Sequence, residues 1–174
     1  MQIIHDFHIN FYDYHLNGKQ NPYPELQQCP RCKDRLIKHG FYQRNILTVN
    51  RYYSVYIRRY KCKHCGRTVS ILPNFLIPRF QTLLILILGA ICHYKKEKHF
   101  LLDPRIVFFY LKRFRNNLNG FIVFFRDLNP LEAFSEKLSE LLTQVLYKIK
   151  RFPPGVATFS KRYFQLFGVS FMSQ

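Results

Sequence analysis

The sequence has few acidic residues and no tryptophan. Its 174 residues include 10 Asp and Glu against 27 Lys and Arg, so the formal net charge is +17. So basic a chain favours a polyanionic partner, most often nucleic acid. The scarcity of carboxylates speaks against DNA strand transfer, which needs separated carboxylates that gather two metal ions. Neither a Ser/His/Asp arrangement nor a glycine-rich phosphate loop is present, and we expect no enzyme activity from this chain alone.

Long hydrophobic runs are also missing. The longest apolar run, residues 83–92, is about half of the ~20 residues that a membrane-spanning helix needs. The N-terminus has no basic head followed by an apolar core, as a signal peptide would have. We therefore expect a buried helix at residues 83–92, no membrane partner and a cytoplasmic location. Apolar residues make up 48% of the chain, enough for a core.

Cysteine is scarce, but four of the five cysteines stand in two pairs. Cys29, Cys32, Cys62 and Cys65 form the pattern C-x2-C-x29-C-x2-C. Two residues between paired cysteines let a tight turn aim both sulfurs at one ion, and four thiolates complete the closed tetrahedral shell of structural zinc. In a reducing compartment such pairs more often hold metal than form disulfides. The spacing predicts one structural Zn²⁺; an iron site and a redox pair are the alternatives.

The residues between the cysteine pairs alternate as strands do. Residues 36–47, a polar turn at 48–51 and residues 52–62 predict a hairpin, and residues 68–72 could add a third strand. Within residues 52–62, Val55, Ile57 and Arg59 fall on one face, while Tyr56, Arg58 and Tyr60 fall on the other. A strand hairpin between two cysteine knuckles is the architecture of a zinc ribbon.

Two helix starts follow the predicted ribbon. Asp103 before Pro104 predicts a helix to about residue 118, and Asn129 before Pro130 predicts another to about residue 151. The second helix carries an apolar seam that could cover the preceding helices, or form a homodimer through helix 130–151. The predicted fold class is α+β, a small N-terminal β zinc ribbon followed by an all-α domain. We expect four segments: a lead-in (1–23), the four-cysteine zinc ribbon (24–77), a helical, helix-turn-helix-like domain (78–151) and a tail (152–174).

Basic residues gather at the second cysteine pair and along the helix predicted from Asp103. Lys and Arg neutralise phosphates, which gives affinity for any nucleic acid. An apolar helix, a basic connector and a capped helix with a basic outer face indicate a helix-turn-helix whose second helix enters the major groove. A plain helical hairpin with a solvated basic face is the alternative. The predicted nucleic-acid contacts are Arg58, Arg59, Lys61, Lys63, Arg67, Arg105, Lys112, Arg115 and Asn116.

Three stretches resemble a known ribbon: CPRC, RLIKHGFYQR and IRRYKCKHCGRTVSILPNFLIP. They are similar to the N-terminal zinc ribbon of bacterial transposases. They resemble more closely a family of short bacterial proteins, of otherwise unknown function, that carry this ribbon before a helix-turn-helix and are often associated with mobile elements. The resemblance covers roughly residues 24–120 and implies the same four cysteines as zinc ligands. It departs in the helix-turn-helix, where transposases often have Trp and this chain has Phe and Tyr.

These patterns together predict a zinc-dependent DNA-binding protein, transposase-like or mobile-element-associated, that binds double-stranded DNA. One alternative is a ribbon that binds RNA or single strands, with tyrosines such as Tyr56 and Tyr60 stacking on unpaired bases. Another is a non-catalytic subunit or remnant of a transposase. A third is an electron carrier that holds iron.

Overall fold

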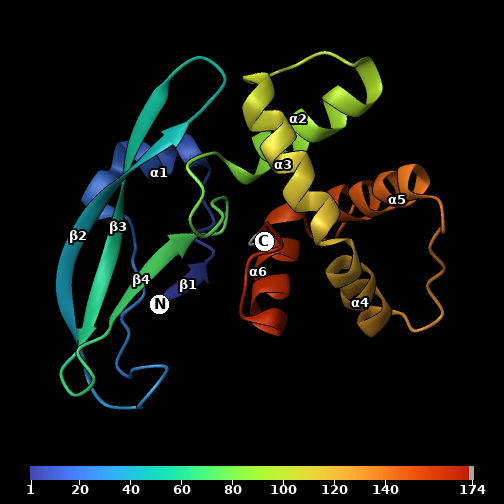
Figure 1. Ribbon diagram of the computed structural model, residues 1–174. Helices are drawn as coiled ribbons and strands as arrows, with labels where there is room; N and C mark the ends of the chain where they lie inside the picture. The colour runs from blue at the N-terminus through green and yellow to red at the C-terminus, as the bar shows by residue number, and fades with distance from the viewer. Residues whose placement is uncertain (173–174) are drawn as a thin grey trace. The chain divides into compact units, whose positions relative to one another are not determined.

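The computed structural model describes residues 1–172 and has the α+β fold that the sequence predicts. A four-stranded sheet lies in the N-terminal part and helices make up the C-terminal part (Figure 1). The chain forms two compact units, Met1–Leu83 and Leu84–Gln174. The elements are β1 (Gln2–His5), α1 (Phe11–Asn17), the 3-10 helix η1 (Gly18–Gln20), β2 (Leu36–Leu47), β3 (Tyr52–Cys62), β4 (Thr68–Pro73), α2 (Leu84–Glu97), α3 (Pro104–Asn116), α4 (Leu118–Leu128), α5 (Leu138–Lys150) and α6 (Val156–Phe167).

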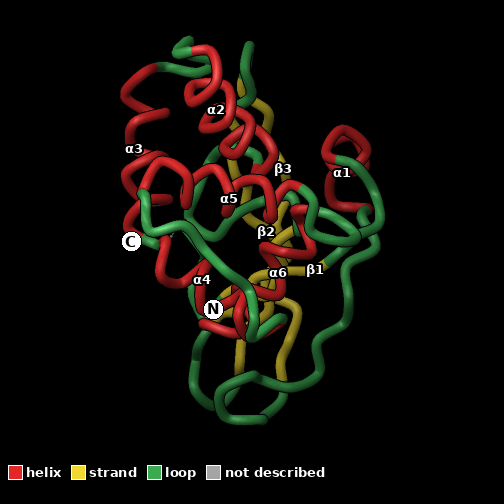
Figure 2. Tube along the Cα trace, turned by 90° about the vertical axis from the view of Figure 1, so that its right-hand side faces the viewer, coloured by secondary structure: helices red, strands yellow, loops and turns green. Residues whose placement is uncertain are grey.

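The sheet of the first unit has the strand order β1-β4-β3-β2, and its strands are yellow in Figure 2. The predicted hairpin is confirmed: β2 and β3 are antiparallel, with Leu36 opposite Cys62 and Leu47 opposite Tyr52. β4 pairs antiparallel with the cysteine end of β3. Because Leu36 lies opposite Cys62, this register brings the two cysteine pairs to the same end of the hairpin.

Residues 1–23, predicted as a lead-in, form part of the first unit. β1 adds to the sheet parallel to β4, with Gln2 opposite Ser70. Tyr14 of α1 is fully buried, and its hydroxyl donates a hydrogen bond of 2.8 Å to the carbonyl of Tyr56. Burial raises the pKa of Tyr14, which keeps its hydroxyl protonated as a donor. The aromatic N-terminus therefore completes the core beside β3.

The second unit confirms two of the predicted helices. α2 buries an apolar face, as expected for residues 83–92. α3 is capped by Asp103, whose carboxylate accepts the backbone N–H of Arg105 at 2.8 Å. Val107 and Phe114 are fully buried on one face of α3, opposite its exposed basic face. Within residues 1–172, no helix is both long and apolar enough to cross a membrane.

The prediction that a helix begins at Asn129 is wrong. α4 ends there: the backbone N–H of Asn129 donates to the carbonyl of Phe125 at 2.9 Å. The next helix, α5, begins only at Leu138. Asn before Pro fits a helix end as well as a helix start, because Asn caps C-termini and Pro commonly follows them.

The predicted apolar seam changes with the helix bounds. Leu131 lies outside α5 and is 92% exposed, whereas Val145 and Ile149 are buried within the second unit. α5 packs against α4 and α6. The seam is thus covered inside the unit, and the homodimer predicted through helix 130–151 stays a prediction. The segment predicted as a tail contains α6, and residues 173–174 lie outside the described residues.

Gly120 of α4 lies at a crowded position, where any larger side chain would clash with its neighbours. A Cβ there would overlap the Tyr163 hydroxyl and lie 2.7 Å from Asn117 Oδ1. Asn117 is buried and donates to the Tyr163 hydroxyl at 2.8 Å, so neither group can move away freely. We expect Gly120→Ala to lower the free energy of unfolding of the second unit by about 1–3 kcal/mol.

Chemical denaturation followed by helical circular dichroism would measure this change. Gly89→Ala is the matched control, because Gly89 is also helical and nothing lies within 4 Å of its added Cβ. The control should leave stability unchanged or raise it by roughly 0.5–1 kcal/mol. Equal effects of the two substitutions would contradict the crowding at Gly120.

Candidate metal centre and basic surfaces

The four paired cysteines meet at one end of the hairpin. All four sulfurs lie within 4.8 Å of one another, with Cys29 Sγ 3.8 Å from Cys65 Sγ and Cys32 Sγ 3.4 Å from Cys62 Sγ. Metal–sulfur bonds of about 2.3 Å in a regular tetrahedron place the sulfurs about 3.8 Å apart. The donor set and its spacing therefore fit one tetrahedral metal ion, held by Cys29, Cys32, Cys62 and Cys65.

The two knuckles have the same local geometry. The backbone N–H of Cys29 donates to the carbonyl of Asp34 at 2.8 Å, and Cys62 donates to Arg67, also five residues on, at 2.9 Å. The residue after each second cysteine is left-handed, with φ of 62° at Lys33 and 67° at Gly66. This reversal turns the chain so that both sulfurs of a pair face the same point. The backbone of each knuckle thus aims both thiols of its pair at one point.

Gly66 gives a prediction about the second knuckle. Nothing lies within 4 Å of a Cβ built on Gly66, so a substitution there costs only backbone strain. We expect Gly66→Ala to destabilise the metal-loaded first unit by about 1–2 kcal/mol, the cost of a left-handed residue. Thermal melting of the metal-loaded protein would measure it. Gly66→Asn should retain more stability because Asn tolerates this conformation; a melting point as low as that of the alanine variant would contradict the strain argument.

The thiols of the cluster differ in how easily they ionise. The backbone N–H groups of Cys32 and Arg31 hold the pKa of Cys29 down at about 6. The backbone N–H of Asp34 acts in the same direction on Cys32, but burial and the neighbouring thiols outweigh it and raise the pKa of Cys32 to about 12. One thiolate therefore forms readily, while further negative charge is disfavoured unless a cation compensates it. Such a cluster is suited to a bound metal cation.

The cysteines are not joined as disulfides. All five are free, and the sulfurs of Cys32 and Cys62 are separated by 3.4 Å against about 2.05 Å for an S–S bond. Cys92 lies in α2, half-buried and outside the cluster. The sulfur spacing alone suits zinc and iron equally, because both form tetrahedral thiolate sites.

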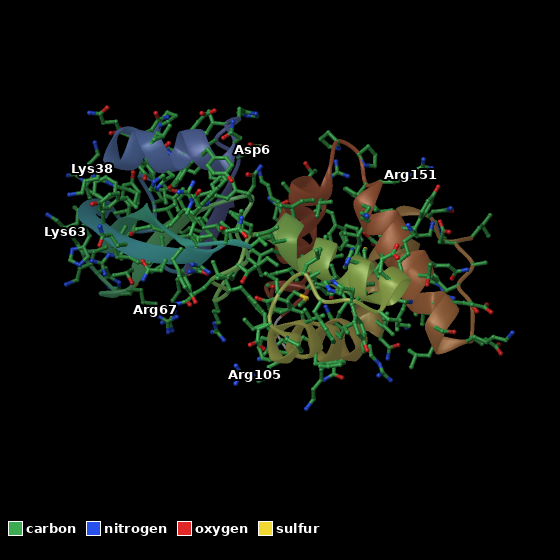
Figure 3. The ribbon with its side chains drawn as sticks, turned by 90° about the horizontal axis from the view of Figure 1, so that it is seen from above. Asp6, Lys38, Lys63, Arg67, Arg105 and Arg151 are labelled. Atoms are coloured by element: carbon green, nitrogen blue, oxygen red, sulfur yellow. The ribbon has the colours of Figure 1, made fainter. Side chains whose placement is uncertain are left out.

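The basic residues predicted around the second knuckle do not form one surface. Arg58 and Arg59 are neighbours on β3 and therefore point to opposite faces of the sheet. The Arg58 guanidinium lies over the ring of Phe41 at 4.6 Å, and that of Arg59 lies over Tyr42 at 5.6 Å. Lys61 shares the face of Arg59, and Lys63 and Arg67 are exposed beside the knuckle. Figure 3 shows Lys63 and Arg67 pointing outward from the first unit.

The residues of α3 predicted to contact nucleic acid fall into two groups, three with unpaired side chains and one in an ion pair. The side chains of Lys112, Arg115 and Asn116 are exposed and make no ion pair or hydrogen bond among the described residues. The guanidinium of Arg105 instead binds the Asp103 carboxylate through Nε at 3.1 Å and Nη2 at 3.0 Å. This bidentate pair neutralises Arg105, so its charge is less available for a phosphate than that of Lys112 or Arg115.

Sequence reasoning missed the groove to which the α3 residues belong. The groove is lined by Tyr94, Lys95, Phe108, Leu111, Lys112, Arg115, Asn116 and Leu142. Lys95 Nζ donates to the Ser139 carbonyl at 3.0 Å and to Thr143 Oγ1 at 2.8 Å, which ties α2 to α5. Lys95 follows the apolar run of residues 83–92 and lies in the last turn of α2.

A protein-family model described as a domain of unknown function (DUF6431) matches residues 29–98, less than half of the chain. The matched segment contains all four clustered cysteines and the elements from β2 to α2, and it ends before α3. No curated protein and no solved structure matches the chain.

Proposed function

We propose that the chain is a zinc-dependent DNA-binding protein, transposase-like or mobile-element-associated, that has no catalytic centre of its own. The observation that carries the proposal is the free basic face of α3. Lys112, Arg115 and Asn116 project from it without carboxylate partners among the described residues. In a chain with a net charge of +17, unpaired cations on one helix face favour a polyanion.

We assign zinc to the cysteine cluster. Four thiolates in a closed tetrahedral shell are typical of structural zinc, which stabilises small domains by holding distant segments together. The ion would join the segment before β2 to the end of β3. Lys61, Lys63 and Arg67 surround the second knuckle with positive charge, which suits an anion-binding module better than an electron carrier. An iron form would be coloured, so the absorption spectrum separates the two metals.

We propose that α2 and α3 act as a helix-turn-helix in which α3 enters the major groove of duplex DNA. A helix fits this groove, which is about 12 Å wide. Arg115 can donate two hydrogen bonds to guanine, and Asn116 can pair with adenine. Lys112 would contact phosphate. Lys61, Lys63 and Arg67 would add phosphate contacts from the ribbon, independent of DNA sequence.

The test combines metal analysis with binding titrations. We expect one zinc per chain, and duplex binding that is tighter than single-strand binding and falls steeply with salt, because phosphate contacts release counterions. Titrations at two salt concentrations with a duplex and with a single strand of equal length give both comparisons. A zinc-loaded protein without affinity for nucleic acid would overturn the proposal.

A further inference from the structure

Arg58 lines a small depression on the face of the sheet opposite Arg59. The depression has a volume of about 180 Å³ and is lined by Lys19, Asn21, Tyr23, Glu25, Lys38, Phe41, Arg58 and Tyr60. Pockets that enclose a whole drug-sized ligand measure roughly 300–1,000 Å³. The depression is therefore large enough for one chemical group of a ligand that continues outside it.

The Arg58 side chain is held in place by two aromatic rings, and its N–H donors have no hydrogen-bond partner among the described residues. Its guanidinium lies 4.6 Å from the Phe41 ring centroid and 5.6 Å from that of Tyr60, which fixes its plane. Within residues 1–172, it donates no hydrogen bond and forms no ion pair. A planar, half-buried guanidinium with free N–H donors is suited to bidentate contact with a phosphate.

The charge of the lining favours an anion. Lys19, Lys38 and Arg58 bring three positive charges, and Glu25 brings the one negative charge, so the net charge is +2. Glu25 Oε1 lies 2.5 Å from Lys38 Nζ, and this contact lowers the pKa of the Glu25 carboxyl. The Glu25 carboxylate is thus paired with Lys38, and the positive charges of Arg58 and Lys19 remain available to a ligand.

A second, larger depression adjoins the first. The two share Glu25, Lys38 and Tyr60, and the second adds the charged residues Lys33, Asp34 and Arg35 at the first knuckle. A chain of phosphates could run from one to the other past the Lys38 side chain, which points outward in Figure 3. The bordering rings hold the cation and do not offer a free face to a base, because the Arg58 guanidinium lies over Phe41 and Tyr60 is only 2% exposed.

We propose that this depression binds one phosphate of an unpaired nucleic-acid strand, which continues along the adjoining depression toward the first knuckle. The inference rests on the proposal that the chain binds nucleic acid. A flexible single strand can bend to follow both adjoining depressions, whereas a rigid duplex would reach only one of them with a phosphate. The first unit would then hold unpaired strand on this face and duplex phosphates on the face of Lys61.

The test compares Arg58→Gln with Lys61→Gln in the full zinc-loaded chain. Both residues lie on β3 and each substitution removes one charge, but the two side chains point to opposite faces. The probes are an oligothymidylate of about 12 nucleotides, a duplex of equal length, and inorganic phosphate as competitor. Unchanged metal content and circular dichroism show that each variant folds. Lys19→Gln, on the exposed helix η1, tests the same depression from outside the sheet; the Lys19 ammonium lies 5.1 Å from the ring of Tyr56 on β3.

We expect Arg58→Gln and Lys19→Gln each to weaken single-strand binding about tenfold and to reduce its salt slope by about 0.7. Their duplex affinity should stay within about twofold of the wild type. Lys61→Gln should do the reverse, reducing the duplex slope by about 0.9. Equal losses in Arg58→Gln and Lys61→Gln, or inorganic phosphate binding more tightly than the strand, would overturn the inference while leaving duplex binding intact. A wild-type protein that binds neither probe would overturn the proposed function itself.

Discussion

Cys62→Ser is expected to release the metal and unfold the ribbon. Cys62 is fully buried at the end of β3, and its sulfur lies 3.4 Å from that of Cys32. A serine hydroxyl stays protonated and does not replace a thiolate ligand. Structural zinc contributes about 10–16 kcal/mol to the folding of small zinc domains, while whole domains are stable by only about 5–15 kcal/mol. The free energy that the ion contributes is therefore about as large as the whole free energy of unfolding expected for the first unit.

Metal content and circular dichroism would be measured together. The strand signal should fall, while the helices of the second unit should persist because they bury a core of their own. Cys92→Ser is the matched control: Cys92 lies in α2, outside the cluster, and its loss should leave the metal content unchanged. Addition of a strong chelator to the wild type should reproduce the effect of Cys62→Ser. A ribbon that keeps its strand signal without metal would show that the apolar core suffices.

Lys112→Ala combined with Arg115→Ala should weaken duplex binding at least tenfold without changing the fold. Both side chains are exposed on α3 and make no hydrogen bond or ion pair among the described residues. If each contacts one phosphate, the double variant should reduce the salt slope by about 1.8. If Arg115 reads a base instead, the slope should fall by about 0.9, and the preference for one sequence should weaken.

A charge-matched control separates position from total charge. Lys150→Ala with Arg151→Ala removes two charges from the end of α5, away from the basic face of α3. This control should cost much less duplex affinity than the α3 double variant. Full duplex affinity in the α3 double variant would remove the proposal that α3 enters the groove, even if the protein still binds DNA through the ribbon.

The hairpin and its metal site were predictable because their signals are local. The strands predicted at residues 36–47 and 52–62 have the same bounds as β2 and β3, since a polar turn and a cysteine knuckle bound each strand. A register shift between Lys38 and Phe41 interrupts the pairing of β2 with β3. Once these strands pair, the two cysteine pairs must meet. The alternation of side chains along residues 52–62 places Arg58 and Arg59 on opposite faces, yet their charge alone suggests one nucleic-acid surface. The sheet places them on two different faces.

The remaining elements depend on contacts that no short pattern contains. β1 has only four residues and its partner strand lies almost 70 residues further on. The start of α5 was misplaced because Asn129 and Pro130 suit either end of a helix. Arg105 was assigned to nucleic acid from its charge alone. Its pairing with Asp103, two residues earlier, depends on the cap geometry that the structure adds.

The parallel pairing of β1 with β4 imposes an order on folding during synthesis. β1 leaves the ribosome well before β4, because Gln2 pairs with Ser70. The cysteines at 29–65 emerge in between, so the knuckles and the β2–β3 hairpin can close while β1 still waits for its partner. Long-range pairing of this kind is slow to form. A nascent chain arrested when residue 65 has left the ribosome but β4 has not should therefore bind metal while its N-terminus is still open to proteases.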